Sequence, residues 1–381
     1  MKILGLETSC DETAAAVLDF RNGGFWILTS VIASSVELQA KYGGIVPEVA
    51  ARKQIEFIMP VLEQGLSKTL FNAAGRQEAK IFDDIDYIAV TNGPGLITSL
   101  RVGVEAARTL SYVWNKPLIA VNHLEGHIYS ALLAEQNKIQ NQKFQKMQAV
   151  RFPAMALVVS GGHTELVLMK DYLDYKIIGE TLDDAMGEAF DKVGKILNLG
   201  YPGGPIISKM ATEGDKTAFN FPRPMLKSGD YNFSFSGLKT AVLYKLKTQN
   251  SKLKIKERKD LCASFQEACV EVLVKKIIRA AEEYKVKTIL IGGGVAANES
   301  LRGRLEMEVD KVNSVKKVDK GEKKIQLLMP ELKYTGDNAV MIALAGYFKI
   351  KNIKRQEGKR GKRRFGWQQT KADPNLGLRQ D

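Results

Sequence analysis

Two of the three histidines in the chain lie four residues apart and offer its clearest candidate for chemistry. His123 and His127 follow Asn122 at a point where an apolar strand gives way to a helix. Residues at i and i+4 of a helix are about 40° apart around its axis, so two imidazoles at this spacing can point at one ion. The pair therefore predicts a metal site. The alternative is an N-cap histidine followed by a buried histidine that packs in the core.

A third ligand should be a carboxylate or another nitrogen donor. Spacing alone leaves four candidates open: Asp11, Glu12, Asp191 and Asp337. Asp337 directly precedes an apolar helix, where an aspartate could serve only as the N-cap. The pattern does not choose among the four.

Strands and helices alternate along the chain, and polar or glycine-rich turns follow the strands. This order predicts an α/β fold with parallel strands and with functional loops at their carboxyl ends. Apolar runs predict the strands, and apolar residues at helical spacing predict the helices. The expected strands are residues 3–6, 14–19, 87–91, 118–121, 154–159, 165–169 and 288–291, and the expected helices are residues 48–70, 99–114 and 340–348.

A strand, a small polar turn and a second strand occur twice, in residues 3–19 and again in residues 154–169. At 381 residues the chain exceeds what one core usually supports, so two lobes are expected. A repeated hairpin predicts a duplicated fold with a cleft between the halves. The predicted parts are a first lobe of residues 1–136 joined by a helix at residues 338–350, a second lobe of residues 152–337, and a basic tail of residues 351–381.

Two glycine clusters follow strands and predict a nucleotide site. Ser160, Gly161 and Gly162 can present backbone N–H groups to an anion without obstruction by a Cβ atom. The glycines that start at Gly292 let a purine or a ribose approach the backbone, and Asn298 can contact the nucleotide or cap the next helix. The glycine patterns of Rossmann and P-loop sites are absent from the sequence.

The net charge of +13 and the sequence pI of about 9.4 favour a polyanionic partner. From Lys349 to Asp381, eleven lysines and arginines face three acidic residues. Residues 359–367 interleave cations with Phe365 and Trp367, whose rings could stack on the bases of a nucleic acid. The alternative is a solvated, disordered tail.

Cysteines and hydropathy limit the class of protein. Cys10, Cys262 and Cys269 are odd in number and lack CxxC spacing, so we expect reduced thiols rather than a disulfide framework or a thiolate zinc site. No apolar run reaches membrane-spanning length, and residues 2–6 have the pattern of a strand rather than of a signal core. A cytoplasmic protein without a membrane partner is expected.

Six motifs stand in series along the chain: Glu7–Thr13, Asn92–Gly95, Asn122–His127, Val159–Thr164, Gly292–Asn298 and Thr335–Ala339. In order and spacing they resemble the TsaD family, the tRNA adenosine threonylcarbamoyltransferases. The resemblance covers about residues 1–350, and six motifs in series are far more specific than any single pattern.

The resemblance implies a two-lobed α/β fold like that of actin, sugar kinases and Hsp70, with duplicated lobes and an active site in the central cleft. It implies one metal ion per subunit, held by His123, His127 and Asp337. Iron as Fe²⁺ is the expected ion, with Zn²⁺ as the alternative, because two imidazoles and one carboxylate suit either and leave positions for substrate or water.

The resemblance also implies which residues meet the substrate. The threonylcarbamoyl and phosphate portion is expected to meet Val158, Val159, Ser160, Gly161 and Gly162. The ribose or base is expected to meet Asp191 and Gly204, and Asn298 is expected to contact the nucleotide from the other side. Asp11 and Glu12 are candidates for the base that accepts the amine proton, although each could equally orient the metal site or belong only to the turn.

The implied reaction is transfer of threonylcarbamoyl from threonylcarbamoyl-AMP to the exocyclic amine of adenosine 37 in tRNAs that read codons beginning with adenosine, with release of AMP. Because the lone pair of this amine is delocalised, catalysis must come from orientation, from a polarised electrophile and from stabilisation of the departing phosphate. The expected partners are tRNA, the adenylate, a TsaB-like paralogue and a TsaE-like ATPase.

Three other functions stay as alternatives. A metalloendopeptidase of the His-Glu-x-x-His type would need its glutamate beside the ion, whereas Glu125 lies about 200° around the helix from His123. A small-molecule kinase would share the fold but would not need the histidine pair. A non-catalytic scaffold would need neither. Residues 135–151 and the lysine-rich residues 311–324 fall between motifs and are expected to lengthen loops.

Overall fold

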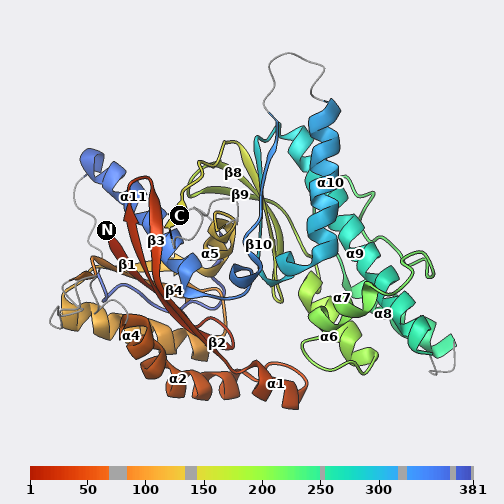
Figure 1. Cartoon of the computed structure of the whole chain (residues 1–381), viewed down its shortest axis with the longest axis horizontal. Coiled ribbons are helices and arrows are strands. Elements are labelled where there is room, and N and C mark those ends of the chain that lie inside the picture. The colour runs from red at the N-terminus through yellow and green to blue at the C-terminus, as the bar shows by residue number, and fades with distance from the viewer. Residues whose placement is uncertain (68–83, 134–143, 249–253, 316–323, 361–365, 379–381) are drawn as a thin grey trace. The chain divides into compact units, whose positions relative to one another are not determined.

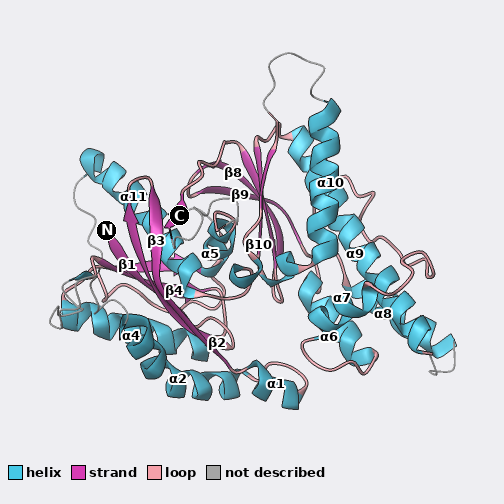
Figure 2. Cartoon of the chain, viewed as in Figure 1, coloured by secondary structure: helices cyan, strands magenta, loops and turns pink. Residues whose placement is uncertain are grey.

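The computed structural model describes residues 1–67, 84–133, 144–248, 254–315, 324–360 and 366–378. The chain divides into two compact units, each with a mixed sheet and helices (Figures 1 and 2). The first unit contains Met1–Ala149 and Gly336–Arg379, and the second contains Val150–Thr335. Asp337 thus belongs to the first unit, whereas the predicted lobe boundary placed it in the second.

The sheet of the first unit has a central parallel part and an antiparallel edge. Its strands in spatial order are β5 (Leu118–Asn122), β4 (Tyr87–Gly93), β1 (Lys2–Glu7), β2 (Glu12–Arg21), β3 (Gly24–Ser34) and β6 (Phe144–Lys146). β5, β4 and β1 run parallel, and β2, β3 and β6 each pair antiparallel with the strand before them in this order. The functional turns therefore follow the carboxyl ends of β1, β4 and β5 at one edge of the sheet.

Helices cover both faces of this sheet, which explains why its central strands are apolar on both sides. The helices are α1 (Val36–Tyr42), α2 (Pro47–Ser67), α4 (Ile97–Trp114), α5 (His123–Ser130) and α11 (Ala339–Arg360). Leu4 and Leu6 of β1 pack in one core cluster with Val61 of α2 and Val104 of α4. On the other face, a Cβ atom on Gly5 would lie 2.3 Å from the carbonyl oxygen of Ala339, so only glycine lets α11 approach β1 this closely.

The second unit repeats the topology of the first. Its strands in spatial order are β11 (Gln326–Leu328), β10 (Thr288–Gly292), β7 (Ala154–Val159), β8 (Thr164–Asp171) and β9 (Asp174–Glu180). β11, β10 and β7 are parallel, and β8 and β9 are antiparallel additions. The order matches β5–β4–β1–β2–β3 strand for strand, so the predicted duplication is confirmed.

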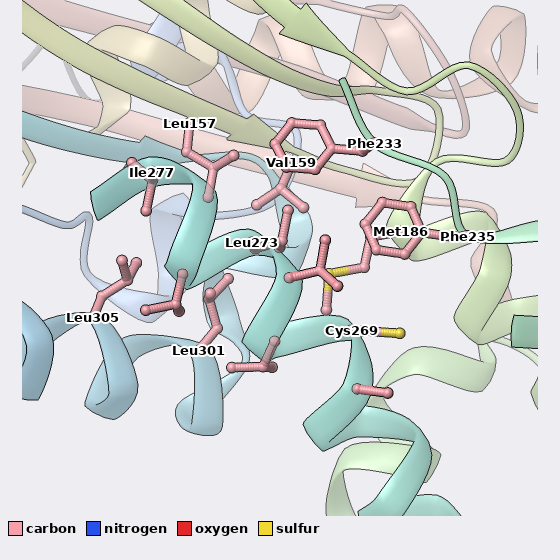
Figure 3. Close-up of a cluster of buried hydrophobic side chains, with 14 of the residues drawn as sticks. Leu157, Val159, Met186, Phe233, Phe235, Cys269, Leu273, Ile277, Leu301 and Leu305 are labelled. Carbon is pink, nitrogen blue, oxygen red and sulfur yellow. The ribbon is translucent and has the colours of Figure 1, made fainter. Parts of the chain in front are cut away.

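One long helix organises the packing of the second unit (Figure 3). The helices of this unit are α6 (Met186–Ile196), α7 (Gly203–Ala211), α8 (Ser236–Thr248), α9 (Ile255–Glu283) and α10 (Glu299–Val315), with short 3₁₀ turns at Gly294–Ala297 and Leu332–Tyr334. Figure 3 shows Leu273 and Ile277 of α9 against Leu157 and Val159 of β7, and all four are fully buried. Cys269, also on α9, belongs to the same core cluster.

The three cysteines are free thiols, in line with the cysteine count. Burial raises the pKa of Cys262 to about 12 and that of Cys269 further, which makes both thiols unreactive core residues.

The C-terminal helix is longer than predicted. The expected helix ended at residue 350, but α11 continues to Arg360. Lysine, arginine and glutamine are good helix formers, and two lysines find aromatic rings: the ammonium of Lys351 lies 4.9 Å from the Tyr347 ring centroid and that of Lys354 lies 5.3 Å from Tyr87.

Several sequence predictions fall outside the described residues. These are residues 135–143 of the insertion, residues 316–323 of the lysine-rich stretch, and residues 361–365 in the middle of the basic stretch. The expectation of a loop at residues 311–324 is wrong for residues 311–315, which are the end of α10. Residues 144–146 of the insertion form β6. Residues 366–378 pack against the first unit, so the interpretation as a solvated, disordered tail is wrong for this segment.

Leu273→Ala should lower the free energy of unfolding by about 2–5 kcal/mol, because it removes a fully buried side chain and leaves a cavity in the second unit. Urea denaturation followed by circular dichroism measures the change. Leu243→Ala is the matched control, since Leu243 on α8 is 39% exposed and its loss should cost less than about 0.5 kcal/mol. Equal effects from the two variants would show that this core does not set stability.

Candidate functional site

The histidine pair stands at the beginning of α5, directly after β5. Asn122 is the N-cap: its side-chain oxygen accepts a hydrogen bond from Leu124 N at 2.8 Å. His123 follows it, and the ring of His127 lies one turn later, with ring centroids 4.5 Å apart. The alternative in which a histidine caps this helix is therefore wrong, and the two imidazoles project from successive turns of α5 toward one point.

Asp337 comes to the same place from the distant end of the sequence. Its Oδ1 atom lies 3.5 Å from Nε2 of His123 and 3.3 Å from Nε2 of His127, and the three side chains offer ligand atoms within 4.8 Å of one another. The first turn of α11 is capped by Asn338, whose Oδ1 accepts a hydrogen bond from Met341 N at 3.0 Å. The alternative role of Asp337 as the N-cap is therefore wrong.

Glu7, at the end of β1, supports His123 from behind and was missed at the level of sequence. Its Oε2 lies 3.1 Å from Nδ1 of His123 and accepts a hydrogen bond from Thr91 Oγ1 at 2.5 Å, while its Oε1 accepts one from Ser9 N at 2.5 Å. Ser9 Oγ lies 3.2 Å from the same Nδ1. A carboxylate that accepts the Nδ1–H bond leaves Nε2 as the lone-pair donor, so Glu7 fixes the tautomer that faces Asp337.

The surroundings shift the pKa values of the two histidines in opposite directions. Burial opposes a charged His123, but the carboxylates of Asp337 and Glu7 outweigh it and raise its pKa to about 9. Burial lowers the pKa of His127, and the neighbouring His123 lowers it further. In the metal-free protein, His123 is accordingly the positive partner of the carboxylates, while His127 is neutral.

The donor set fits one divalent metal ion. Both ring nitrogens of His127 are buried: Nδ1 has no hydrogen-bond partner among the described residues, and Nε2 faces only the Asp337 carboxylate, at 3.3 Å. An imidazole left this way is costly unless a ligand meets it. Two imidazole nitrogens and one carboxylate oxygen form the donor set of zinc sites and of non-haem Fe²⁺ sites. His123, His127 and Asp337 are thus the residues in the described part of the chain that could hold such an ion.

Above about pH 9, where His123 no longer carries a competing proton, Glu7→Gln should weaken metal binding by about 10- to 100-fold, because an amide holds the His123 ring less firmly and makes Nε2 less basic. Equilibrium dialysis with Zn²⁺ or Co²⁺ measures the affinity. Glu63→Gln on the exposed side of α2 is the matched control and should bind like wild type. Wild-type affinity in Glu7→Gln would show that the contact with His123 has no part in binding.

Asp11 stands in the turn from β1 to β2 and Glu12 begins β2, where it lies within electrostatic reach of Asp337. Burial raises the pKa of Glu12 well above its usual value, and the charges of Asp337 and Asp11 raise it further. Burial and the same carboxylates also raise the pKa of the Cys10 thiol. A carboxylate with a raised pKa is a stronger base, which is compatible with the predicted role of Glu12 in taking a proton.

Glu125 is turned toward α11 and not toward the candidate metal ligands. Its Oε2 forms an ion pair with Lys349 Nζ at 2.8 Å. This removes the carboxylate that a peptidase of the His-Glu-x-x-His type would need beside its ion.

The second unit contains a cavity of about 930 Å³, a size suited to a nucleotide. Four of the eight residues predicted to bind substrate line it: Gly161, Asp191, Gly204 and Asn298. Sequence reasoning missed other lining residues, because they lie outside the glycine motifs, on α7, on α9 and in the turn region that follows α7. These include Ser208, Lys209, Lys216, Gln266 and Glu267.

Asp191 serves the start of α7, where its Oδ1 accepts hydrogen bonds from Gly203 N at 2.8 Å and Gly204 N at 3.3 Å. Burial raises its pKa, although these two N–H groups oppose the rise. Asp191 therefore shapes this wall of the cavity.

The side chain of Asn298 is fully engaged by protein groups. Its amide nitrogen donates to Ser208 Oγ at 2.9 Å and to Gln266 Oε1 at 2.7 Å, and its oxygen accepts from Leu301 N at 2.9 Å. Of the two roles that the sequence left open, the structure shows the helix cap.

The residues from Val158 to Gly162 differ in what they expose. Val158 and Val159 are fully buried, and the Val159 side chain points into the core in Figure 3. Ser160 closes the hairpin turn, because its backbone N donates a hydrogen bond to the His163 oxygen at 2.8 Å. Gly161 and Gly162 are exposed, and nothing lies within 4 Å of where a Cβ atom would be. The open backbone of the stretch is thus at the two glycines.

Comparison with known proteins assigns the chain to a family. A family model described as TsaD, tRNA N6-adenosine threonylcarbamoyltransferase, matches residues 26–344. Curated relatives of the same name include one from Bacillus licheniformis, 46% identical over 360 residues that cover 94% of each chain. Another, from Listeria welshimeri, is 47% identical over 344 residues that cover 90% of each chain.

A solved structure supports the fold. HypF from T. kodakarensis aligns with a TM-score of 0.53 at 15% identity, over 92% of this chain and 48% of the longer HypF chain. With the duplicated sheets, this confirms the predicted α/β fold of the actin, sugar kinase and Hsp70 type. The likeness to HypF concerns the fold alone, whereas the family model and the curated relatives carry the functional class. The chain belongs to the TsaD family of tRNA N6-adenosine threonylcarbamoyltransferases.

Proposed function

We propose that this protein transfers the threonylcarbamoyl group from threonylcarbamoyl-AMP to the N6 amine of adenosine 37, in tRNAs that read codons beginning with adenosine, and releases AMP. As a transferase of this family it acts on tRNA, and its net charge of +13 suits a polyanionic substrate. The observation that carries the proposal is the group of His123, His127 and Asp337, with Glu7 behind it. A small-molecule kinase would need neither the pair nor its support.

We propose one Fe²⁺ per subunit as the ion at this group, with Zn²⁺ as the alternative. When bound, the ion supplies a Lewis acid that polarises the threonylcarbamoyl oxygens. The protein's own part is to hold the three donors: the N-cap Asn122 fixes the start of α5, and Glu7 orients the His123 ring. Preorganised donors avoid reorganisation at the moment of reaction.

The cavity of the second unit is the proposed site of the adenylate's nucleotide. Gly161 and Gly162 can offer N–H groups to the phosphate, because no side chain stands over them. Asp191 and Gly204 would meet the ribose or base near the start of α7, and Asn298, the cap residue before α10, would face the nucleotide from the other side. Val158, Val159 and Ser160 would hold the two glycines in place from the end of β7, since the valine side chains are buried and Ser160 N is bonded to the His163 oxygen.

In the transfer step, the N6 nitrogen forms a bond to the carbamoyl carbon, and the bond from that carbon to the phosphate oxygen breaks. AMP leaves with the electron pair, and the amine gives up one proton. Glu12 or Asp11 is the proposed acceptor of this proton, and the raised pKa of Glu12 favours it as the base.

The remaining partners are proposals as well. A TsaB-like paralogue and a TsaE-like ATPase would act with this chain, and the basic residues 359–367 would contact the tRNA backbone. We also propose a cytoplasmic location. Within the described ranges, none of the helices combines the length and the apolar character needed to cross a bilayer.

The test uses purified protein, unmodified tRNA and threonylcarbamoyl-AMP labelled in the threonine. Label should enter the RNA and AMP should be released in equal amounts. A tRNA with guanosine in place of adenosine 37 is the control and should stay unlabelled. Absence of transfer, together with ATP-dependent phosphorylation of a small molecule, would favour the kinase. Absence of both, when the protein stimulates transfer by another subunit, would favour a scaffold.

A further inference from the structure

The segment after the basic stretch is an irregular strap on the first unit, with turns at residues 367–369 and 374–375. We define the C-terminal strap as residues 366–378, which lie beyond the residues matched by the family model. Its burial alternates: Ala372, Leu376 and Leu378 face inward, while Lys371 and Asp373 are exposed, and Leu378 is only 3% exposed. This alternation of inward and outward residues shows a segment laid along a surface.

Aromatic contacts anchor the start of the strap on α4. The carbonyl oxygen of Trp367 accepts a hydrogen bond from Arg108 Nε at 3.0 Å, and the Arg108 guanidinium carbon lies 5.8 Å from the Trp367 ring centroid. Tyr112 meets the same indole edge to face at 5.4 Å. Trp367 and Ala372 also pack against the core cluster of the first unit. The strap is thus held by burial as well as by hydrogen bonds.

The middle of the strap crosses the turn that follows β4. Asp373 N donates to the Asn92 oxygen at 2.7 Å, and Gly95 N donates to the Pro374 oxygen at 3.3 Å. A Cβ atom on Gly93 would lie 1.9 Å from the Asp373 oxygen, a clash that no side chain can avoid at its φ of +155°. The glycine is therefore required because the strap lies directly on it.

The turn after β4 also contacts Ser9, which lies next to His123. On its other side, a Cβ atom on Gly95 would lie 2.5 Å from the Ser9 oxygen, and Leu96 N donates to that oxygen at 2.8 Å. Ser9 Oγ is the group 3.2 Å from Nδ1 of His123. The turn is thus held between the strap and a residue that contacts the imidazole.

The end of the strap acts on the cap of α5 directly. Asn122 Nδ2 donates to the Leu376 oxygen at 3.2 Å and to the Gly377 oxygen at 3.1 Å. Its Oδ1 is the acceptor that caps Leu124 N. Since both donors of the amide end on the strap and its acceptor ends on the helix, the strap decides how the cap is oriented.

From these contacts we infer that the C-terminal strap positions the histidine pair, and that Asn122 is the positioning residue that connects the strap to it. The inference rests on the proposed metal role of His123, His127 and Asp337. Supporting groups behind ligands typically contribute about 10- to 100-fold to metal affinity. The strap should therefore raise metal affinity, and not only the stability of the fold.

Asn122→Ser separates the two functions of the asparagine. Serine keeps a side-chain oxygen that can cap α5, but it is too short to replace the two donors to the strap. We expect Zn²⁺ and Co²⁺ affinity to fall about tenfold or more, with a changed Co²⁺ absorption spectrum. A chain that ends at Phe365 removes the whole strap and should show the same loss, whereas a chain that ends at Leu378 should bind like wild type.

Asn313→Ser is the matched control for a buried asparagine. Asn313 in the second unit exchanges two hydrogen bonds with the Ile325 backbone, at 3.0 and 2.7 Å, and has no contact with the histidines. It should lower the melting temperature without changing metal affinity. If Asn122→Ser and the chain ending at Phe365 both bind metal like wild type, the inference is wrong.

The same assay distinguishes failure of the inference from failure of the metal proposal. Wild type should bind one equivalent of metal, and His127→Ala should abolish this binding. Equal binding by wild type and His127→Ala would overturn the metal proposal itself and the inference with it. If only His127→Ala loses metal binding, the metal site is supported, but the strap has no part in it.

Discussion

Asp337→Ala should reduce the single-turnover rate of threonylcarbamoyl transfer by about 1000-fold. The carboxylate lies 3.5 and 3.3 Å from the two histidine nitrogens, so its removal takes away the anionic donor of the group. A Lewis acid lowers the activation free energy by several kcal/mol, and about 4 kcal/mol corresponds to three powers of ten in rate. Rapid-quench assays with labelled threonylcarbamoyl-AMP and unmodified tRNA measure the rate at saturating donor.

The double variant makes this test sharper. If His127 and Asp337 act through one ion, Asp337→Ala combined with His127→Ala should be no slower than either single variant, because either one already removes the ion. Asp84→Ala changes an exposed aspartate of the first unit that pairs with Lys2 at 2.8 Å, and it should keep the wild-type rate. Wild-type rates in both single variants would remove the metal centre from the mechanism.

Metal affinity should rise about tenfold for each pH unit between pH 6 and 8 and level off near pH 9. The pKa of His123 is raised to about 9, so the metal-free protein carries a proton there that an ion at Nε2 must displace. The lowered pKa of His127 means that this ring is already neutral and releases none. Binding should therefore release about one proton per ion, and affinity should increase with pH.

Calorimetry at pH 7 in two buffers with different ionisation enthalpies measures this proton. Glu7→Gln provides an internal check: without the Glu7 charge the pKa of His123 falls, so the affinity of that variant should level off at a lower pH. A flat affinity between pH 6 and 8 in the wild-type protein would show that His123 is neutral before the ion arrives.

Local patterns in the sequence determined much of this protein. Strand and helix periodicity predicted the α/β order, because each is a short repeat that neighbouring residues carry by themselves. The i, i+4 spacing of His123 and His127 placed both rings on one side of a helix for the same reason. The six motifs together identified the family, which the family model and the curated relatives confirm.

Contacts between distant parts of the chain were decided only by the tertiary structure. Glu7 supports His123 across 116 residues, and Asn122 meets the strap across 254. Nothing in the spacing preferred Asp337 over Asp11, Glu12 or Asp191, because ligand choice depends on which strand ends meet at one edge of a sheet. The strap alternates apolar and polar residues only over the short stretch from Lys371 to Leu378, and this local pattern cannot say which surface the strap crosses, because that surface comes from distant parts of the chain.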